Sequence, residues 1–208
     1  MFIKKSTLKR MLNTAYKTQG LYIDNDGEGY RMKGSYWDLW VKRDKLPKEY
    51  KADIVSLIGD LPEIGSGGSY TKDGIQQEMP GESPRDIAEK EGGLYINTGV
   101  IVVSPRGEIL RLLQSPKDCE TMFIYNYIAE GISNSIVDSE NGETQAEGMY
   151  NPYDNMLMLK NNVMVFVTYA RNEPCLHKFK TLMENYWVRS LINPETEDEP
   201  EEENEEET

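Results

Sequence analysis

Short apolar segments joined by tight polar turns constrain this chain more than any other feature of its sequence. The residues at the turns are glycine or asparagine, which tolerate the positive φ that a two-residue hairpin turn requires. The sequence therefore predicts two β-hairpins, the first extended into a meander by an apolar segment before it. The paired segments are 30–33 and 36–42 around Gly34-Ser35, and 156–160 and 163–170 around Asn161-Asn162.

Helical periodicity predicts amphipathic helices beside these hairpins. The first follows Ser6, a favourable N-cap residue, and ends at Gly20. The second starts at Pro47, and two more are expected from Asp118 to Gly131 and from Leu176 to Trp187. A strand is expected at 94–103, while the segment 108–114 fits a strand and a short helix equally well. The predicted fold class is α+β, with antiparallel hairpins or a sheet packed against amphipathic helices.

A shift of 127 residues superimposes the two hairpins without gaps and places Pro47 on Pro174. A duplicated helix-hairpin-helix unit explains this pattern, and so does chance recurrence of a common supersecondary unit. The polar, glycine-rich segment 62–93 is the best boundary between halves. We therefore expect an α+β half at 1–61, a flexible loop or linker at 62–93, a second α+β half at 94–193 and a tail at 194–208.

Charge is distributed unevenly along the chain. The net charge is −13, yet residues 194–208 alone hold ten acidic residues and no basic one, so the rest of the chain carries only −3. Such a segment repels itself and predicts a disordered tail that either aids solubility or binds, in cis or in trans. The first twenty residues are basic instead, which makes five of them candidates for binding nucleic acid or the tail. These five are Lys4, Lys5, Lys9, Arg10 and Lys17.

Few residues have the types and spacing that catalysis or metal binding needs. His177 is the only histidine, so histidine pairs are excluded, and Cys119 and Cys175 stand at expected helix starts without a motif. The alternating carboxylates from Asp24 to Glu28 resemble the start of a calcium loop, but Ser35 stands where the closing glutamate belongs. We predict no catalytic residues, no cofactor and no metal.

Cysteine usage and hydropathy set the expected compartment. Two cysteines do not make a disulfide framework, and no segment has the length of a signal peptide core or a membrane span. The sequence predicts a cytoplasmic protein with reduced thiols and no membrane partner.

Aromatic residues are concentrated on the first hairpin. If the alternate residues Trp37, Leu39 and Val41 face the core, Tyr36 and Trp40 point outward, unless a second layer covers that face. Exposed aromatic side chains often anchor protein interfaces. Tyr36, Trp40 and Tyr30 are therefore the candidate partner-binding residues.

These observations favour a non-enzymatic binding protein, an adaptor or inhibitor of the kind that phage and mobile elements encode. A protein is the expected partner. The alternative is a DNA accessory factor, because a duplicated helix-hairpin unit with a basic first helix is also the layout of sliding-clamp domains. An enzyme of an unrecognised type is the third hypothesis, and the oligomeric state stays open.

Overall fold

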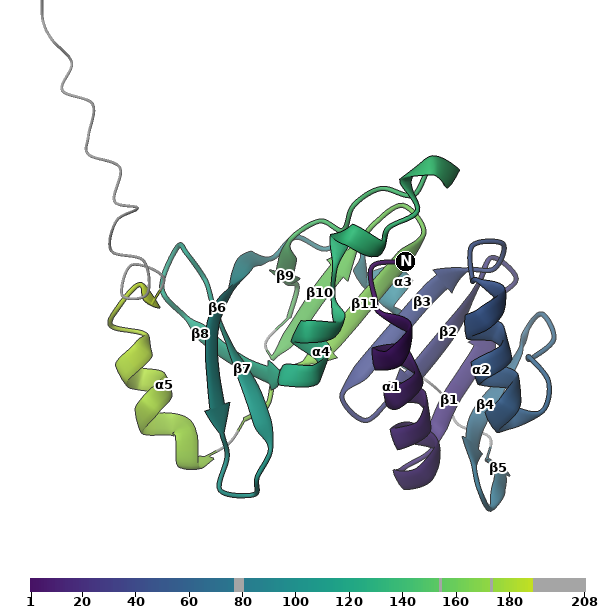
Figure 1. Ribbon diagram of the computed structural model, residues 1–208, viewed down its shortest axis with the longest axis horizontal. Helices are drawn as coiled ribbons and strands as arrows, with labels where there is room; N and C mark the ends of the chain where they lie inside the picture. Colours follow the sequence, from purple (N-terminus) through teal and green to yellow (C-terminus); the bar gives the residue numbers. More distant parts are fainter. Residues whose placement is uncertain (77–80, 154, 173, 189–208) are drawn as a thin grey trace, which may run out of the picture.

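The computed structural model describes residues 1–76, 81–153, 155–172 and 174–188, and Figure 1 shows the arrangement of their helices and strands. The acidic tail at 194–208 lies outside the described residues, so its predicted disorder stays a prediction. Among the described residues, no helix has both the length and the apolar composition needed to cross a bilayer.

One antiparallel sheet of 11 strands runs through the molecule in the order β5-β4-β1-β2-β3-β11-β10-β9-β6-β7-β8. The apolar, β-branched and aromatic segments of the sequence supply its strands, which confirms the expected mixture of helices and antiparallel sheet. The strands are β1 (Leu21–Asn25), β2 (Gly29–Gly34), β3 (Trp37–Lys42), β4 (Ser66–Thr71), β5 (Gly74–Gln76), β6 (Gly93–Val103), β7 (Ile109–Gln114), β8 (Thr121–Tyr125), β9 (Met149–Asn151), β10 (Met156–Lys160) and β11 (Met164–Tyr169).

Both predicted hairpins are present, and they join each other at the middle of the sheet. Strand β3 pairs with β11, so that Leu39 lies directly opposite Phe166. In the first hairpin Lys33 lies opposite Asp38. The residues 127 positions later are Lys160 and Val165, and these lie opposite each other in the second hairpin. The two hairpins therefore have the same register at the shift found in the sequence, and their common origin by duplication stays a prediction.

Helices cover both faces of the sheet (Figure 1). Three helices, α1, α2 and α4, enclose the main core, in which the apolar stripe of α1 packs between the strands and α4. The other face carries α3 over β3 and β11 and α5 over β8. The helices are α1 (Lys5–Thr18), α2 (Lys48–Ile58), α3 (Pro84–Ile87), α4 (Asn126–Gly131) and α5 (His177–Met183).

The segment 62–93, expected to be a flexible loop or linker, contains regular structure. Strands β4 and β5 extend the sheet at its edge, and residues 81–90 cross the face of the sheet opposite α1. Arg31 fixes this crossing by donating to the carbonyl oxygens of Gly81 and Glu82, at 2.9 and 2.8 Å. Sequence periodicity missed these short strands because two of the six residues of β4 are glycine and the strand has no apolar alternation. The division of the chain into two halves here stays a prediction.

Several expected boundaries are wrong in detail. Residues 121–125 form strand β8 rather than the first turns of a helix, because they pair with β7 and their side chains enter two cores. Lys4 rather than Ser6 precedes α1, and Gly34 pairs with Trp37, so that Ser35 and Tyr36 make the turn. The C-terminal helix ends at Met183, and the ambiguous segment 109–114 is a strand.

Candidate functional site

A cavity of about 470 Å³ opens between α1, α4, the β2–β3 turn and the start of β7. Three tyrosine rings line it, so we call it the tyrosine pocket. Its walls come from segments far apart in the sequence, which the sheet and the two helices bring together. The lining residues are Arg10, Thr14, Tyr36, Gly107, Glu108, Ile109, Tyr125, Asn126, Tyr127 and Glu130.

Local structure explains how each ring reaches the pocket. Tyr36 is one of the two residues that turn the first hairpin, so its side chain leaves the sheet at its end. Tyr125 is the last residue of β8, and Tyr127 lies in the first turn of α4, which starts immediately after that strand. The abrupt change from strand to helix at Asn126 therefore places two rings of the same short segment in one wall.

The rings form a continuous aromatic cluster. Tyr36 meets Tyr125 edge-on with ring centroids 5.2 Å apart, and Tyr125 meets Tyr127 at 5.7 Å. The Arg171 guanidinium lies 4.5 Å from the Tyr36 centroid and 5.1 Å from that of Tyr125. Aromatic and cation–π contacts of this kind stabilise by roughly 0.5–1.5 kcal/mol each. They hold the rings in fixed positions around the cavity.

Glu108 links the Tyr125 ring to the Arg171 guanidinium. Its carboxylate accepts a hydrogen bond of 2.8 Å from the Tyr125 hydroxyl and pairs with Arg171 at 3.3 Å. Burial and this bond to Glu108 both favour the neutral phenol, so they raise the pKa of Tyr125. Burial also raises the pKa of Tyr127, against the opposing charge of Arg10. Both rings are therefore neutral hydrogen-bonding groups at physiological pH.

Arg10 and Arg111 complete the electrostatics of the pocket. Arg10 is exposed on α1, and its guanidinium carbon lies 4.2 Å from the centroid of the Tyr127 ring. Arg111 donates to the Asn126 side chain at 2.8 and 2.9 Å and lies 3.7 Å from the Glu130 carboxylate. Thus the pocket has one cation over a ring at Arg10, and the polar groups of Asn126 and Glu130 are held by Arg111.

Exposed apolar side chains continue from the pocket along the β6–β7 hairpin. Val103 lies opposite Ile109, and Ile101 lies opposite Arg111, so these four side chains share one face of the hairpin. Val103 is 64% exposed, Ile109 51% and Ile101 49%. We call Ile101, Val103 and Ile109 the hairpin face. Ile109 belongs to this face and to the wall of the tyrosine pocket, so the two surfaces are continuous.

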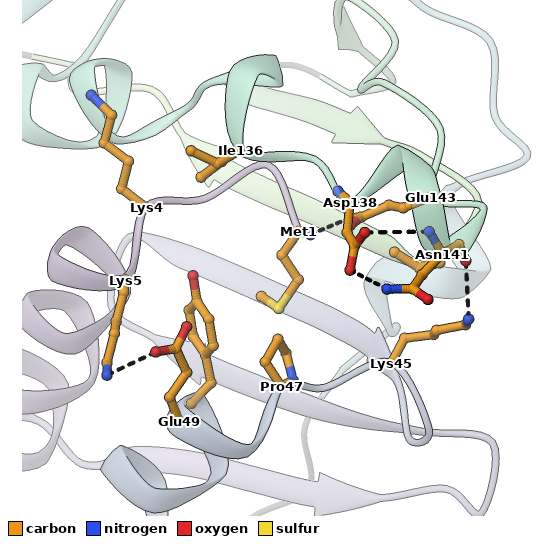
Figure 2. A pocket seen from close by; sticks show the side chains of 12 residues that line it. Met1, Lys4, Lys5, Lys45, Pro47, Glu49, Ile136, Asp138, Asn141 and Glu143 are labelled. Atoms are coloured by element: carbon orange, nitrogen blue, oxygen red, sulfur yellow. Dashed lines mark hydrogen bonds and ion pairs between the residues drawn. The ribbon is translucent and has the colours of Figure 1, made fainter.

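A second cavity, of about 480 Å³, lies beside the first residues of the chain and is called the N-terminal cleft. Figure 2 shows that several of its charged and polar groups bind one another. Lys5 pairs with Glu49 at 3.2 Å, and the amino group of Met1 pairs with Glu143. Burial would raise the pKa of Glu143, but hydrogen bonds, that from the amino group foremost, lower it. The polar groups of this cleft are therefore largely satisfied within the chain.

The three candidate partner-binding residues have different surroundings. Tyr36 is half-buried and lines the tyrosine pocket. Trp40 is 6% exposed, because the segment 81–90 covers its face and brings Arg85 to 5.5 Å from its ring, and its indole donates to Asp26 at 2.9 Å. Tyr30 is 8% exposed within the main core. Of the two alternatives for the Trp40 face, the covering second layer is the one observed, and helices cover the other face, on which Tyr30 lies. The role of these residues in partner binding stays a prediction.

The candidate nucleic-acid-binding residues do not gather on one surface. Lys9 pairs with Asp53 of α2 at 2.9 Å, Lys5 pairs with Glu49, and Lys4 donates to the Glu130 carbonyl at 2.8 Å. Arg10 lies on the tyrosine pocket, and Lys17 is exposed in the last turn of α1. Three of the five are thus engaged within the chain, and their role in nucleic-acid binding stays a prediction.

The thiols and the histidine are not assembled into a catalytic group. Cys119 is half-buried in the turn before β8, at a φ of 59°, and not at a helix start. Cys175 is exposed in the single turn before α5, two residues before His177. Among the described residues, no side-chain hydrogen bond joins either thiol to His177, and no group of three His, Cys, Asp or Glu has the spacing of a metal site.

Sequence reasoning found Tyr36 and Arg10 but missed the site they share. Tyr125 and Tyr127 were not site candidates, because the segment from Asp118 to Gly131 was expected to form one helix. The hairpin face was missed as well. The signal for this face is the apolar run Ile101-Val102-Val103. Such a run makes both faces of a strand apolar, so each face would need a covering layer.

Comparisons with known proteins show no close relative. No protein-family model matches the chain, and neither does any curated protein. Among solved structures, the DNA polymerase III beta chain of Streptococcus pneumoniae TIGR4 is similar at 12% identity and a TM-score of 0.35. The beta subunit of DNA polymerase from Streptococcus pyogenes is similar at 13% and 0.30. In both cases the match covers 85% of this chain and 66% of the other, so these are weak structural likenesses.

Proposed function

We propose that this chain is a binding protein that takes up a segment of a protein partner in the tyrosine pocket, with the hairpin face as the adjoining platform. The observation that carries the proposal is the continuity of these two surfaces at Ile109. An apolar surface rimmed by polar groups marks an interaction site more often than scattered exposed apolar residues do.

The composition of the pocket supports a protein partner. Tyrosine and arginine dominate the energetically important positions of protein interfaces, and three tyrosines with Arg10 line this cavity. The ring cluster is held by Arg171 and Glu108, so little side-chain entropy is lost on binding. A cavity of about 470 Å³ has room for one or two large side chains of a partner.

The DNA-associated alternative rests on the basic residues of the first helix. Lys5 and Lys9 are neutralised by Glu49 and Asp53, which leaves fewer free cations for a phosphate backbone. The weak likeness to the two polymerase subunits carries no argument for it. A duplex-binding measurement at low and moderate salt tests this alternative beside the main proposal.

The test of the proposal is selection of short peptides from a random display library on the immobilised full chain. Selected peptides are then labelled and their dissociation constants are measured by fluorescence anisotropy. Replacing Ile109 by Asp places a charge where the pocket and the hairpin face meet. We expect Ile109→Asp to weaken binding by about tenfold or more, which is the cost of one desolvated contact at the centre of an interface.

The matched control is Ile75→Asp, because Ile75 is an isoleucine on strand β5 that is 68% exposed and lies at the far end of the sheet. Thermal melts of both variants check that each folds. Equal affinity of the two variants for the selected peptides, or selection of no peptide at all, would contradict the proposal.

A further inference from the structure

We infer that the segment taken up by the tyrosine pocket carries an aromatic or large apolar side chain next to an Asp or Glu, whose carboxylate pairs with Arg10. This inference rests on the proposed function and names the chemistry of the partner. It follows from the partners of the three charged residues that line the pocket, Glu108, Glu130 and Arg10.

Both carboxylates that line the pocket already have partners. Glu108 binds the Tyr125 hydroxyl and Arg171. Glu130 accepts from the Asn126 amide at 2.9 Å and lies 3.7 Å from Arg111. Each of these carboxylates therefore lies within 4 Å of an arginine other than Arg10, and among the described residues no ion pair joins either of them to Arg10.

Arg10 is the basic residue of the pocket lining that forms no ion pair among the described residues. In the part of the chain that the structure describes, its guanidinium forms a cation–π contact with Tyr127 and no ion pair. Stacking uses the face of the guanidinium and leaves its N–H groups at the edge, where they can bind a carboxylate in the same plane. Thr14 lies one helical turn further along the same rim, and its hydroxyl is a second donor.

The tyrosine-lined cavity and the Arg10 guanidinium lie close enough together for adjacent residues of a peptide to contact both. Arg10 covers Tyr127, and the Tyr127 ring meets Tyr125 at 5.7 Å. A side chain that enters the cavity and packs against the tyrosine rings thus lies beside the Arg10 guanidinium. A nucleic-acid strand fits this arrangement less well, because its regularly spaced phosphates would meet Glu108 and Glu130 on the other walls.

The experiment uses synthetic peptides from the library selection, each made in two forms that differ only by Asp→Asn or Glu→Gln next to the apolar residue. For the full chain we expect the acidic form to bind about tenfold more tightly, as a charge-assisted bond to arginine does. In Arg10→Gln this preference should disappear, so that the two forms bind about equally, because only the acidic form loses affinity. Arg10→Lys should retain part of it.

The control is Lys17→Gln, which removes an exposed positive charge two turns further along the same helix. An unchanged preference in Arg10→Gln, or an equal loss in Lys17→Gln, overturns the inference even when the peptides still bind. Two results together would support the proposed function and overturn only the role of Arg10. These are that Ile109→Asp binds neither peptide form and that Arg10→Gln still prefers the acidic form. Absence of any peptide binding overturns both.

Discussion

Tyr36, from the turn of the first hairpin, packs edge-on against Tyr125, at the end of β8, with ring centroids 5.2 Å apart. Tyr36 comes from the interior of the sheet and Tyr125 from its terminal strand, yet both line the same pocket. The pocket is therefore a product of the complete fold, because its walls come from α1, the β2–β3 turn and the segment 107–130.

The bond between Tyr125 and Glu108 should stabilise the fold as well as the pocket. Replacing Tyr125 by Phe removes a hydrogen bond of 2.8 Å and leaves the rings in place. We expect a loss of roughly 1 kcal/mol in the free energy of unfolding, measured by urea denaturation. Tyr186→Phe, at an exposed tyrosine, serves as the control and should change stability by less than about half as much.

The seam between the two hairpins should be the most sensitive part of the core. Phe166 is fully buried opposite Leu39, so Phe166→Ala opens a cavity in the main core beside the seam. We expect this variant to lose about 3–5 kcal/mol of stability. Leu182→Ala, on the half-exposed surface of α5, should cost far less. Similar losses for both variants in denaturant melts would show that the seam is not tightly packed.

The segment 81–90 should depend on the buried pair of Arg31 and Asp38. These side chains are 4% and 2% exposed, with Nη2 and Oδ2 2.6 Å apart, and Arg31 also holds the carbonyls of Gly81 and Glu82. Arg31→Met leaves Asp38 buried without a partner, so we expect a loss of roughly 3–5 kcal/mol.

Hydrogen exchange separates the two roles of Arg31. The double variant Arg31→Met with Asp38→Leu should recover most of the lost stability, because it removes the unpaired charge. Amide exchange in residues 83–88 should nevertheless stay faster than in the parent chain, since both carbonyl contacts are gone. Exchange that returns to the parent rate in the double variant would mean that Arg31 does not hold this segment.

Stability should fall at alkaline pH because a buried phenol must ionise. Tyr50 donates to the Ile3 carbonyl at 3.0 Å, and burial foremost raises its pKa to about 12. Its folded pKa thus exceeds its ordinary value of 10.0, so the folded state holds the proton longer. The contribution is complete below pH 10 and is lost as the pH rises towards 12, by roughly 2–3 kcal/mol in total.

Tyr50→Phe isolates this contribution from those of the other buried tyrosines. The variant should be less stable near neutral pH, where the hydrogen bond is lost, and should have a shallower decline above pH 10. Parallel stability curves for the two proteins, from urea melts at several pH values, would assign the alkaline loss to other groups.

The sequence predicted the parts of this fold whose signals are local. The stripe of Leu8, Met11, Leu12 and Ala15 defined α1, and the turns between apolar runs defined the hairpins. Thr121–Tyr125 was assigned to a helix because the short apolar run that follows Thr121 fits both periods, and only pairing with β7 decides between them. The segment 81–90 could not be predicted, because its position depends on contacts with Arg31 some fifty residues earlier.

The site was predictable only as separate residues. Tyr36 and Arg10 were chosen for different roles, one as a protein anchor and one as a phosphate ligand, and the fold places both on the same cavity. Trp40 carries the same aromatic signal as Tyr36, but the segment 81–90 covers it. Residue type therefore identified candidates, and long-range packing decided which of them lie on a cavity.

The most direct test of the central claim is the hydrogen-exchange footprint of a selected peptide on the full chain. The account predicts slower exchange at three places in the peptide complex: the tip of the β6–β7 hairpin at 101–111, the turn at 34–37, and the start of α4 at 125–130. Strands β4 and β5 should be unchanged. A footprint centred on the N-terminal cleft, or protection that leaves residues 101–111 unaffected, would contradict the assignment of the tyrosine pocket as the binding site.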